Sequence, residues 1–183
     1  ALLMTPEQIS EWAQAHRAAS NGSFQINLWI PEPAPERNPD AEAEMRAFLG
    51  SWGPEVPETA AEVALPDFSA QCDAILEAGP TVVSSIMGVY PPEVVRAFKQ
   101  RGIRWFATIT TLAEAREAIA AGADVLVAQG AEAGGHRGAF INMNAEAQAI
   151  GLFSLLPSIV DNVDVPVVAT GGIADSRGVA AAL

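Results

Sequence analysis

His136 stands in a glycine-rich stretch, residues 129–138, that directly follows the apolar run 124–128. Four glycines within nine residues let this backbone approach a ligand closely and expose N–H groups to it. An imidazole has a reference pKa of about 6.5, which lies near working pH and suits a general base. A histidine beside glycines is also a common turn residue. The local pattern leaves both interpretations open.

A second glycine motif, Gly171-Gly172, leaves the apolar run 165–170 shortly before a helix that begins near Asp175 or Ser176. Barrel enzymes often bind phosphate with backbone N–H groups of such a loop and with the start of the following helix. The alternative is a tight turn that binds no ligand. Each of the two glycine motifs directly follows an apolar run that is expected to be a strand of a repeating unit.

Two amides are further candidates for ligand contacts. Asn27 is polar within an apolar run, and Gln129 stands at the end of another. Each side chain could bind a ligand or could only satisfy a neighbouring group. Cys72 falls within a helix and is expected to be a small buried side chain, whereas His16 is expected to face solvent on a surface helix.

Several chemistries find no support in the motifs. Two histidines and one cysteine cannot build the common structural zinc sites, so no metal site is predicted. No P-loop pattern and no Gly-x-Ser-x-Gly elbow occurs in the sequence.

The elements that must position these residues follow a regular rhythm of helix and strand. Capping boxes begin helices at Thr5 and Thr111, and glycines end helices at Gly79, Gly102 and Gly122. Short apolar runs follow, and the expected strands are 24–30, 81–87, 105–109, 124–128 and 165–170. The Val- and Ile-rich runs are typical of parallel strands that are covered on both faces. This α/β pattern fits either a doubly wound sheet or a barrel.

The stretch 31–66 breaks this rhythm. It holds seven prolines and eight acidic residues, with a possible short helix at 41–49. We interpret it as an insertion in a single domain covering residues 1–183. A solvated surface segment and a lid over the site are the two alternatives, since long loops after a barrel strand lie on the active face.

Composition excludes some classes of partner. Lys and Arg number 10 against 22 Asp and Glu, a net charge of −12, so the surface repels nucleic acid and anionic lipid. No apolar run approaches the roughly 20 residues that span a membrane. The single cysteine fits a reducing compartment, and we expect a cytoplasmic protein. Both ends of the sequence suggest an internal piece of a longer chain.

Together, residues 129–138 (Gln-Gly-Ala-Glu-Ala-Gly-Gly-His-Arg-Gly) and 166–175 (Pro-Val-Val-Ala-Thr-Gly-Gly-Ile-Ala-Asp) resemble the nitronate monooxygenase family. Residues 4–9 and 24–28 are similar to the second helix and third strand of that family. The resemblance spans nearly the whole chain, and the segment 31–66 fits it least specifically. It implies a (β/α)8 TIM barrel of which about strands 3–7 are present here.

The resemblance also implies a cofactor, FMN, and roles for individual residues. His136 matches the catalytic base or substrate-orienting histidine. Asn27, Gln129 and Gly134 match positions that contact the flavin, and the pair Gly171-Gly172 matches the phosphate loop. The expected reaction is oxidation of alkyl nitronates or nitroalkanes by O2 to carbonyl compounds and nitrite; the 183-residue piece alone is expected to be inactive.

Two rival interpretations remain at this point. A flavin-dependent enoyl-acyl carrier protein reductase carries a similar loop but passes electrons from NAD(P)H through FMN to a C=C bond. A non-catalytic remnant of a barrel is the other, and FMN binding would argue against it. The expected partners are a small nitro compound and O2, and the sequence does not define the oligomeric state.

Overall fold

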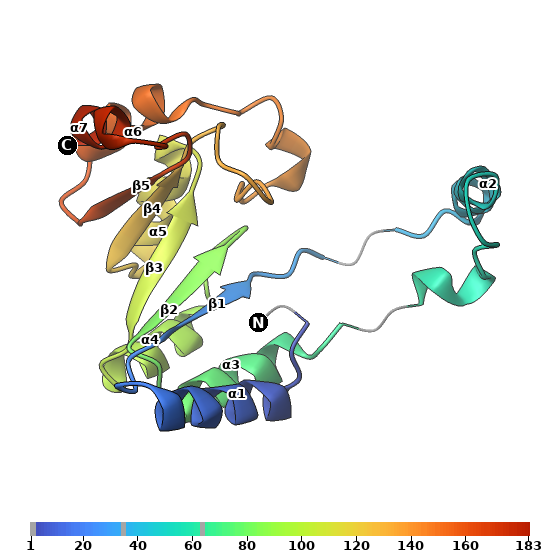
Figure 1. The fold of residues 1–183 in the computed structure, drawn as a ribbon, viewed down its shortest axis with the longest axis horizontal. Coiled ribbons are helices and arrows are strands. Elements are labelled where there is room, and N and C mark those ends of the chain that lie inside the picture. The colour runs from blue at the N-terminus through green and yellow to red at the C-terminus, as the bar shows by residue number, and fades with distance from the viewer. Residues whose placement is uncertain (1–2, 34–35, 63–64) are drawn as a thin grey trace. The chain divides into compact units, whose positions relative to one another are not determined.

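A computed structural model of the 183-residue chain describes residues 3–33, 36–62 and 65–183 (Figure 1). The described residues form five strands, β1 (Gln25–Trp29), β2 (Val82–Ile86), β3 (Arg104–Ile109), β4 (Val125–Gln129) and β5 (Val167–Thr170). Their longer helices are α1 (Pro6–Ala19), α2 (Pro39–Gly50), α3 (Phe68–Ala78), α4 (Pro92–Gln100), α5 (Leu112–Ala121), α6 (Leu152–Val160) and α7 (Ser176–Ala182). Two short 3-10 helices cover Glu58–Ala61 and Asn142–Asn144.

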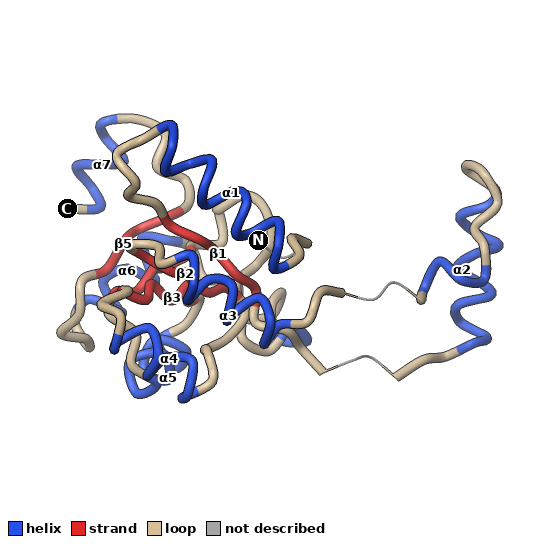
Figure 2. Tube along the Cα trace, turned by 90° about the horizontal axis from the view of Figure 1, so that it is seen from below, coloured by secondary structure: helices blue, strands red, loops and turns tan. Residues whose placement is uncertain are grey.

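The strands form one parallel sheet in which spatial order equals chain order, β1-β2-β3-β4-β5 (Figure 1). Figure 2 shows the strands in red and the helices in blue. Connections between neighbouring parallel strands are right-handed, so a sheet that never reverses its order receives all its crossover helices on one face. A doubly wound sheet would reverse order at a switch point. The winding therefore selects the barrel over the doubly wound alternative.

Burial alternates along β1 and β3, whereas the three middle residues of β2 are all buried. On the helix-covered face, the side chains of Leu28, Val83, Trp105, Ala107, Ile109, Leu126 and Ala128 are fully buried. They pack with apolar residues from the helices in one core that includes Ile9, Ile75, Phe98, Ala115 and Leu155. The opposite face carries more exposed and more polar side chains, among them Gln25, Asn27 and Thr108.

Local signals placed the helix ends correctly. Thr5 and Thr111 both form the expected capping boxes, and the Asp67 side chain caps α3 by accepting the N–H of Ala70. Gly79 and Gly122 end their helices in the left-handed conformation, which glycine adopts without steric cost.

The last strand is shorter than expected at its start. It begins at Val167 instead of Val165, because Pro166 has no N–H to donate to a neighbouring strand. The carbonyl of Pro166 still accepts the N–H of Leu126, so the approach to β5 already runs beside β4. The strand expected over 81–87 likewise ends at Ile86, since Met87 turns to a φ of 68°.

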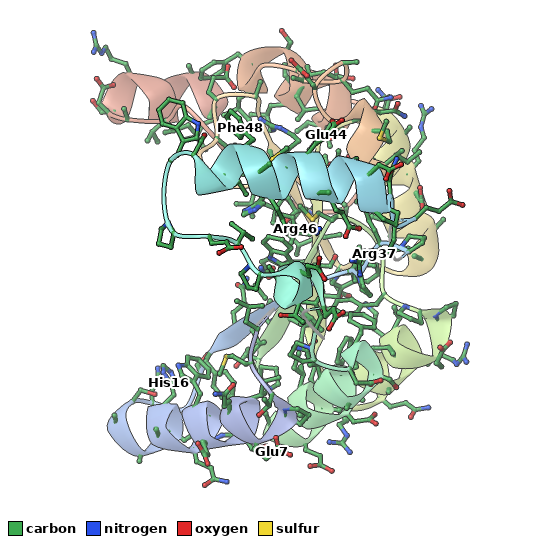
Figure 3. The ribbon with its side chains drawn as sticks, turned by 90° about the vertical axis from the view of Figure 1, so that its right-hand side faces the viewer. Glu7, His16, Arg37, Glu44, Arg46 and Phe48 are labelled. Carbon is green, nitrogen blue, oxygen red and sulfur yellow. The ribbon has the colours of Figure 1, made fainter. Side chains whose placement is uncertain are left out.

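The chain divides into two compact units, one of residues 1–31 with 67–183 and one of Glu32–Pro66. In the second unit α2 is capped by Asn38 and spans Pro39–Gly50, longer than the predicted 41–49. Large apolar side chains of this unit are exposed, including Phe48, which Figure 3 shows on α2 with Arg46. Our interpretation of this stretch as an insertion in one domain stays a prediction.

Across the described residues, no helix has both the length and the apolar character needed to cross a membrane.

Candidate active site

The less covered face of the sheet carries a short chain of polar side chains at β1 and β2. Gln25 and Asn27 lie on this face and pair in register with Val82 and Ser84. The Gln25 amide donates to the Ser84 hydroxyl at 2.9 Å, and that hydroxyl donates to Asn27 Oδ1 at 2.8 Å. The Asn27 amide is therefore oriented by the buried Ser84, while its side chain remains exposed on the strand.

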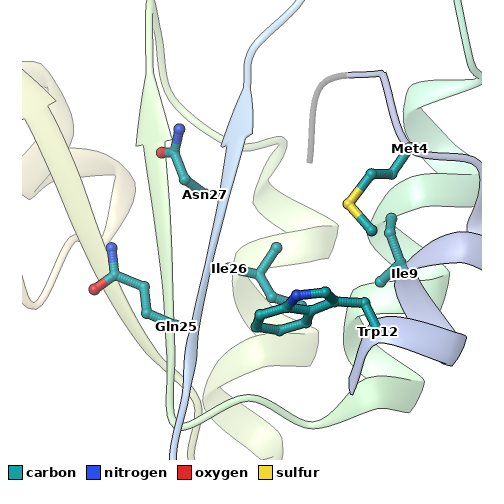
Figure 4. A pocket seen from close by; sticks show the side chains of 6 residues that line it. All are labelled: Met4, Ile9, Trp12, Gln25, Ile26 and Asn27. Atoms are coloured by element: carbon teal, nitrogen blue, oxygen red, sulfur yellow. The ribbon is translucent and has the colours of Figure 1, made fainter. Parts of the chain in front are cut away.

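A cavity of about 150 Å³ lies beside β1 and is lined by Met4, Ile9, Trp12, Gln25, Ile26 and Asn27. Figure 4 shows Ile26 turned toward Trp12, while Gln25 and Asn27 point to the other side of the strand. Successive side chains of β1 point to opposite faces of the sheet, so Ile26 packs toward α1 while Asn27 lies on the polar face.

Gln129 ends β4 and organises the loop that follows. It is 7% exposed; its Oε1 accepts the N–H of Gly138 at 2.7 Å, and its Nε2 donates to the carbonyl of His136 at 2.9 Å. The side chain thus holds the main chain of the predicted catalytic residue. The amide nitrogen of Gln129 carries two N–H groups, so one of them remains after the hydrogen bond to the His136 carbonyl.

Arg137 stabilises the same loop through hydrogen bonds to its backbone carbonyls. Its guanidinium donates to the carbonyls of Gln129 at 3.3 Å, Gly130 at 2.9 Å and Ala131 at 2.9 Å. Several planar donors on one side chain can satisfy successive carbonyls that leave a strand without sheet partners. The arginine beside His136 therefore has a local structural role in this loop.

The loop crosses the ends of several strands. A Cβ on Gly138 would come 3.0 Å from Thr108 of β3 and 3.2 Å from Ile86 of β2. The His136 ring then meets the Trp29 ring of β1, with centroids 4.5 Å apart and planes at 64°. His136 itself is exposed. Its imidazole consequently lies at the carboxyl ends of the strands, the edge where barrels bind their substrates.

Glu114 fixes the far part of this loop. Its buried carboxylate accepts the N–H of Thr110 at 2.6 Å, the Thr110 hydroxyl at 2.8 Å and the N–H of Phe140 at 2.9 Å. The capping box predicted only its bond near Thr111. The contact with Phe140 shows that the start of α5 and the loop after β4 are one connected structure.

Glu132 joins the two glycine motifs. Its carboxylate accepts the N–H of Leu152 at 2.9 Å, and this bond is the main cause that lowers the pKa of Glu132. A Cβ on Gly172 would lie 3.2 Å from Glu132 Cβ, and one on Gly171 would lie 2.9 Å from the Ala133 nitrogen. Both glycines have positive φ, so the close approach of the two loops and the backbone conformation each require glycine.

Open space and unused donors remain beside these contacts. A Cβ on Gly134 would meet no protein atom within 4 Å. Among the described residues, no acceptor receives a hydrogen bond from the N–H of Gly171 or Gly172. Exposed N–H groups next to glycines are chemically suited to an anion such as a phosphate. The structure therefore brings together Gln129, Gly134, His136, Gly171 and Gly172, while Asn27 lies on β1 two residues before Trp29.

The remaining predictions about single residues can be compared directly. Cys72 is buried as expected, and burial raises the pKa of its thiol to about 12. His16 is only partly exposed on α1, where it was expected to face solvent: its ring stacks on Trp12 and lies 5.4 Å from the Phe24 ring. Within the described ranges, no cluster of three or more His, Cys, Asp or Glu side chains is arranged to hold a metal.

Sequence reasoning missed Trp29 and the long-range partners of Glu114 and Glu132. Trp29 follows Gln25 and Asn27 at alternate positions of β1, so the sequence could have placed all three side chains on the same face of the strand. The contact of Trp29 with His136 was not predictable in this way, because the two residues come from different strand units. Glu114 lies in the first turn of α5, shortly after β3, and Glu132 lies in the loop after β4. This position just beyond a strand was the one signal that could have marked them.

Five parallel strands wound in one direction, with the candidate site residues at their carboxyl ends, define a piece of a barrel of the enzyme type. Comparison with known proteins gives the family: residues 1–183 match the family described as nitronate monooxygenase. The chain belongs to the nitronate monooxygenase family, and its fold is an incomplete (β/α)8 barrel.

Relatives and solved structures agree with this assignment. A probable nitronate monooxygenase of Staphylococcus saprophyticus is 34% identical over 164 residues, 87% of this chain and 46% of that protein. One of Staphylococcus aureus is 31% identical over 180 residues, 97% of this chain and 50% of that protein. The chain spans about half the length of these curated relatives.

Among solved structures, the nitroalkane oxidase from Streptomyces ansochromogenes superposes with a TM-score of 0.80 at 30% identity, covering 98% of this chain and 53% of that one. FabK from Thermotoga maritima superposes with a TM-score of 0.65 at 24% identity, covering 98% of this chain and 43% of that one. The second likeness shows the fold alone.

Proposed function

We propose that the full-length protein is an FMN-dependent oxidoreductase that uses O2 to oxidise alkyl nitronates or nitroalkanes to carbonyl compounds and nitrite. The observation that carries the proposal is the placement of His136 at the strand ends, with its carbonyl held by Gln129 and its ring against Trp29. Membership of the nitronate monooxygenase family and the likeness to a nitroalkane oxidase support the same chemistry.

The residues present fit FMN. The N–H groups of Gly171 and Gly172 are free to bind its phosphate, and the open space at Gly134 lets the backbone approach the flavin. Asn27 and the remaining N–H of Gln129 would contact the ring system. When bound, FMN supplies the redox chemistry that protein side chains lack.

His136 is assigned the proton step. With a neutral nitroalkane, an imidazole nitrogen of His136 takes the proton from the carbon next to the nitro group, and the substrate becomes the nitronate anion. The protonated ring then lies beside that anion and stabilises its charge. A preformed nitronate arrives without this proton, so its oxidation does not need the base.

The difference between these two substrates provides the test. In the FMN-loaded full-length protein, His136→Asn is expected to lower kcat/KM for a neutral nitroalkane by about 100- to 10,000-fold. The loss with the matching nitronate should be smaller, and bound flavin should be retained. The matched control is His16→Asn, which changes the other histidine of the chain and should leave both activities unchanged.

Three outcomes would contradict parts of this proposal. Equal losses on both substrates would assign His136 to binding or electrostatics. No loss on either would remove it from the mechanism. Rapid flavin reduction by NADH without any nitro compound would instead favour the enoyl-acyl carrier protein reductase chemistry.

A further inference from the structure

The main chain and the side chain of His136 are held by different strands. Its carbonyl accepts from Gln129 at the end of β4, whereas its ring packs against Trp29 at the end of β1. β1 and β4 are not neighbours in the sheet, since β2 and β3 lie between them. The loop therefore reaches across the sheet before the imidazole meets its aromatic neighbour.

Trp29 is itself well fixed. It pairs in register with Ile86, and the next residue, Ile30, donates its N–H to the Ile86 carbonyl at 3.1 Å. The indole is half-buried and stands on the same face of β1 as Asn27. A side chain on a strand positions its neighbour more accurately than one on a loop.

We propose that Trp29 is a positioning residue that sets the orientation of the His136 imidazole. The inference rests on the proposed role of His136 as the base. An exposed imidazole on a glycine-rich loop can rotate about its side-chain bonds, and the tilted contact with Trp29 selects one orientation. Such aromatic contacts shift an equilibrium by about 2- to 10-fold beyond simple burial.

A purely apolar wall would behave differently from a positioning residue. If Trp29 only lined the substrate site, its replacement would raise KM and act independently of His136. If it orients the imidazole, its replacement lowers kcat, and the effect disappears once the imidazole is gone. The two roles can therefore be separated by kinetics in combination with a second variant.

The first experiment observes the contact without measuring activity. In protein labelled with 13C-histidine, the ring protons of His136 should be displaced by the ring current of Trp29, and His136→Asn identifies their signal. Trp29→Leu should move that signal toward the position of free histidine, whereas Trp29→Phe should retain part of the displacement.

The chain offers a matched control for this measurement. Trp12 stacks on His16 with ring centroids 5.2 Å apart, so Trp12→Leu removes the other Trp–His contact and should move only the His16 signal. Figure 3 shows His16 on α1. An unchanged His136 signal in Trp29→Leu would overturn the proposal.

The second experiment is a double-mutant cycle in the FMN-loaded full-length protein. Trp29→Leu should lower kcat for a neutral nitroalkane by about 2- to 10-fold with little change in KM, and Trp29→Phe should recover most of the loss. In the His136→Asn background, Trp29→Leu should cause no further loss.

The failures of the two assignments give different results. Multiplied losses in the double variant, with His136→Asn alone behaving as expected, would overturn the role of Trp29 and leave His136 as the base. A His136→Asn protein with full activity would overturn the proposed function, while the ring-current measurement would still report the contact.

Discussion

The two ends of the sheet are built by different means. At the amino ends of β2, β3 and β4, three residues connect each preceding helix to its strand, and a glycine with positive φ stands in every connection. At the carboxyl ends, the loop 130–151 is held by side chains from several elements, including Gln129 and Glu114. The amino ends combine short glycine turns with a few bonds between elements, such as the Trp105 N–H donating to the Asp124 carboxylate at 2.7 Å. The carboxyl ends gather distant residues around one position.

Each end also has its own tryptophan and histidine in ring contact. Trp12 and His16 lie on α1, and His16 interacts with the carbonyl of Ser23 just before β1. Trp29 and His136 lie at the carboxyl ends of the strands. The same pair of residue types thus serves helix packing at one end and, in our proposal, catalysis at the other. Residue type alone does not distinguish the two roles, whereas position along the strands does.

The largest effect that separates the two ends is expected at glycines. Gly102 has a φ of 69° and open space around its missing side chain, whereas a Cβ on Gly130 would come 2.5 Å from Leu152 Cβ and 2.8 Å from Leu152 Cα. Gly130→Ala should therefore destabilise the protein by about 3 kcal/mol or more, and Gly130→Asn by more still. Gly102→Ala should cost about 1–2 kcal/mol, and Gly102→Asn less, because asparagine tolerates the left-handed conformation.

Urea unfolding of the four variants measures this reversal of order. The free energy of unfolding should fall from alanine to asparagine at position 130 and rise from alanine to asparagine at position 102. The same order at both positions would mean that backbone conformation, and not space, explains both glycines.

The amino ends were the more predictable part of the molecule. Gly79 and Gly122 could be assigned from the sequence because a helix end, a positive φ and a following apolar run are all local. The start of β5 at Val167 was equally predictable, because the missing N–H of Pro166 is visible in the sequence. The direction in which the strands wind was not predictable from local signals, because it depends on the order of strands in space.

At the carboxyl ends the sequence predicted candidate site loops, an assignment that stays a prediction, and it did not predict what holds these loops. The glycines and His136 form recognisable motifs within single loops. Glu114 contacts Phe140, and Glu132 lies against Gly172. Each pair joins two different strand–helix repeats of the sequence, so no local pattern predicts these contacts. Gln129 shows the limit clearly: predicted as a flavin contact, it also holds two backbone groups of the His136 loop.

A second, intermediate effect should separate glycines that make room for protein from those that make room for a ligand. Gly134→Val adds a side chain where no protein atom lies within 4 Å, so it should leave stability nearly unchanged and weaken FMN binding by about 5- to 150-fold. Gly172→Val should weaken FMN binding and also lower stability, since Gly172 has a φ of 68° and faces Glu132.

Flavin titration and urea unfolding of both apo-proteins provide the two measurements. Full FMN occupancy and yellow colour in Gly172→Val would show that the phosphate-loop assignment is wrong. Unchanged FMN affinity in Gly134→Val would remove Gly134 from the flavin site and leave the phosphate loop unaffected.

The smallest effect concerns pH and the joint between the two glycine loops. The bond from the Leu152 N–H lowers the pKa of Glu132 below its ordinary value of 4.5 in the folded state. A lowered pKa means that the ionised carboxylate stabilises the fold above the unfolded pKa and loses this contribution as pH falls through the folded value. The amino ends of β2 to β4, held by glycine conformations, have no comparable dependence on this carboxylate.

Replacing the carboxylate by an amide tests this dependence. Glu132→Gln retains an oxygen that can accept the Leu152 N–H but cannot ionise, so the parent should be more stable than the variant at pH 7. That difference should shrink as pH falls below about 4.5, because the protonated parent then resembles the variant. Urea unfolding at neutral and acidic pH measures the difference, and Glu146→Gln controls for the loss of one exposed carboxylate nearby in the chain. A difference between parent and Glu132→Gln that stayed constant from pH 7 to pH 3 would show that the charge of Glu132 does not stabilise the joint between the His136 loop and the start of α6.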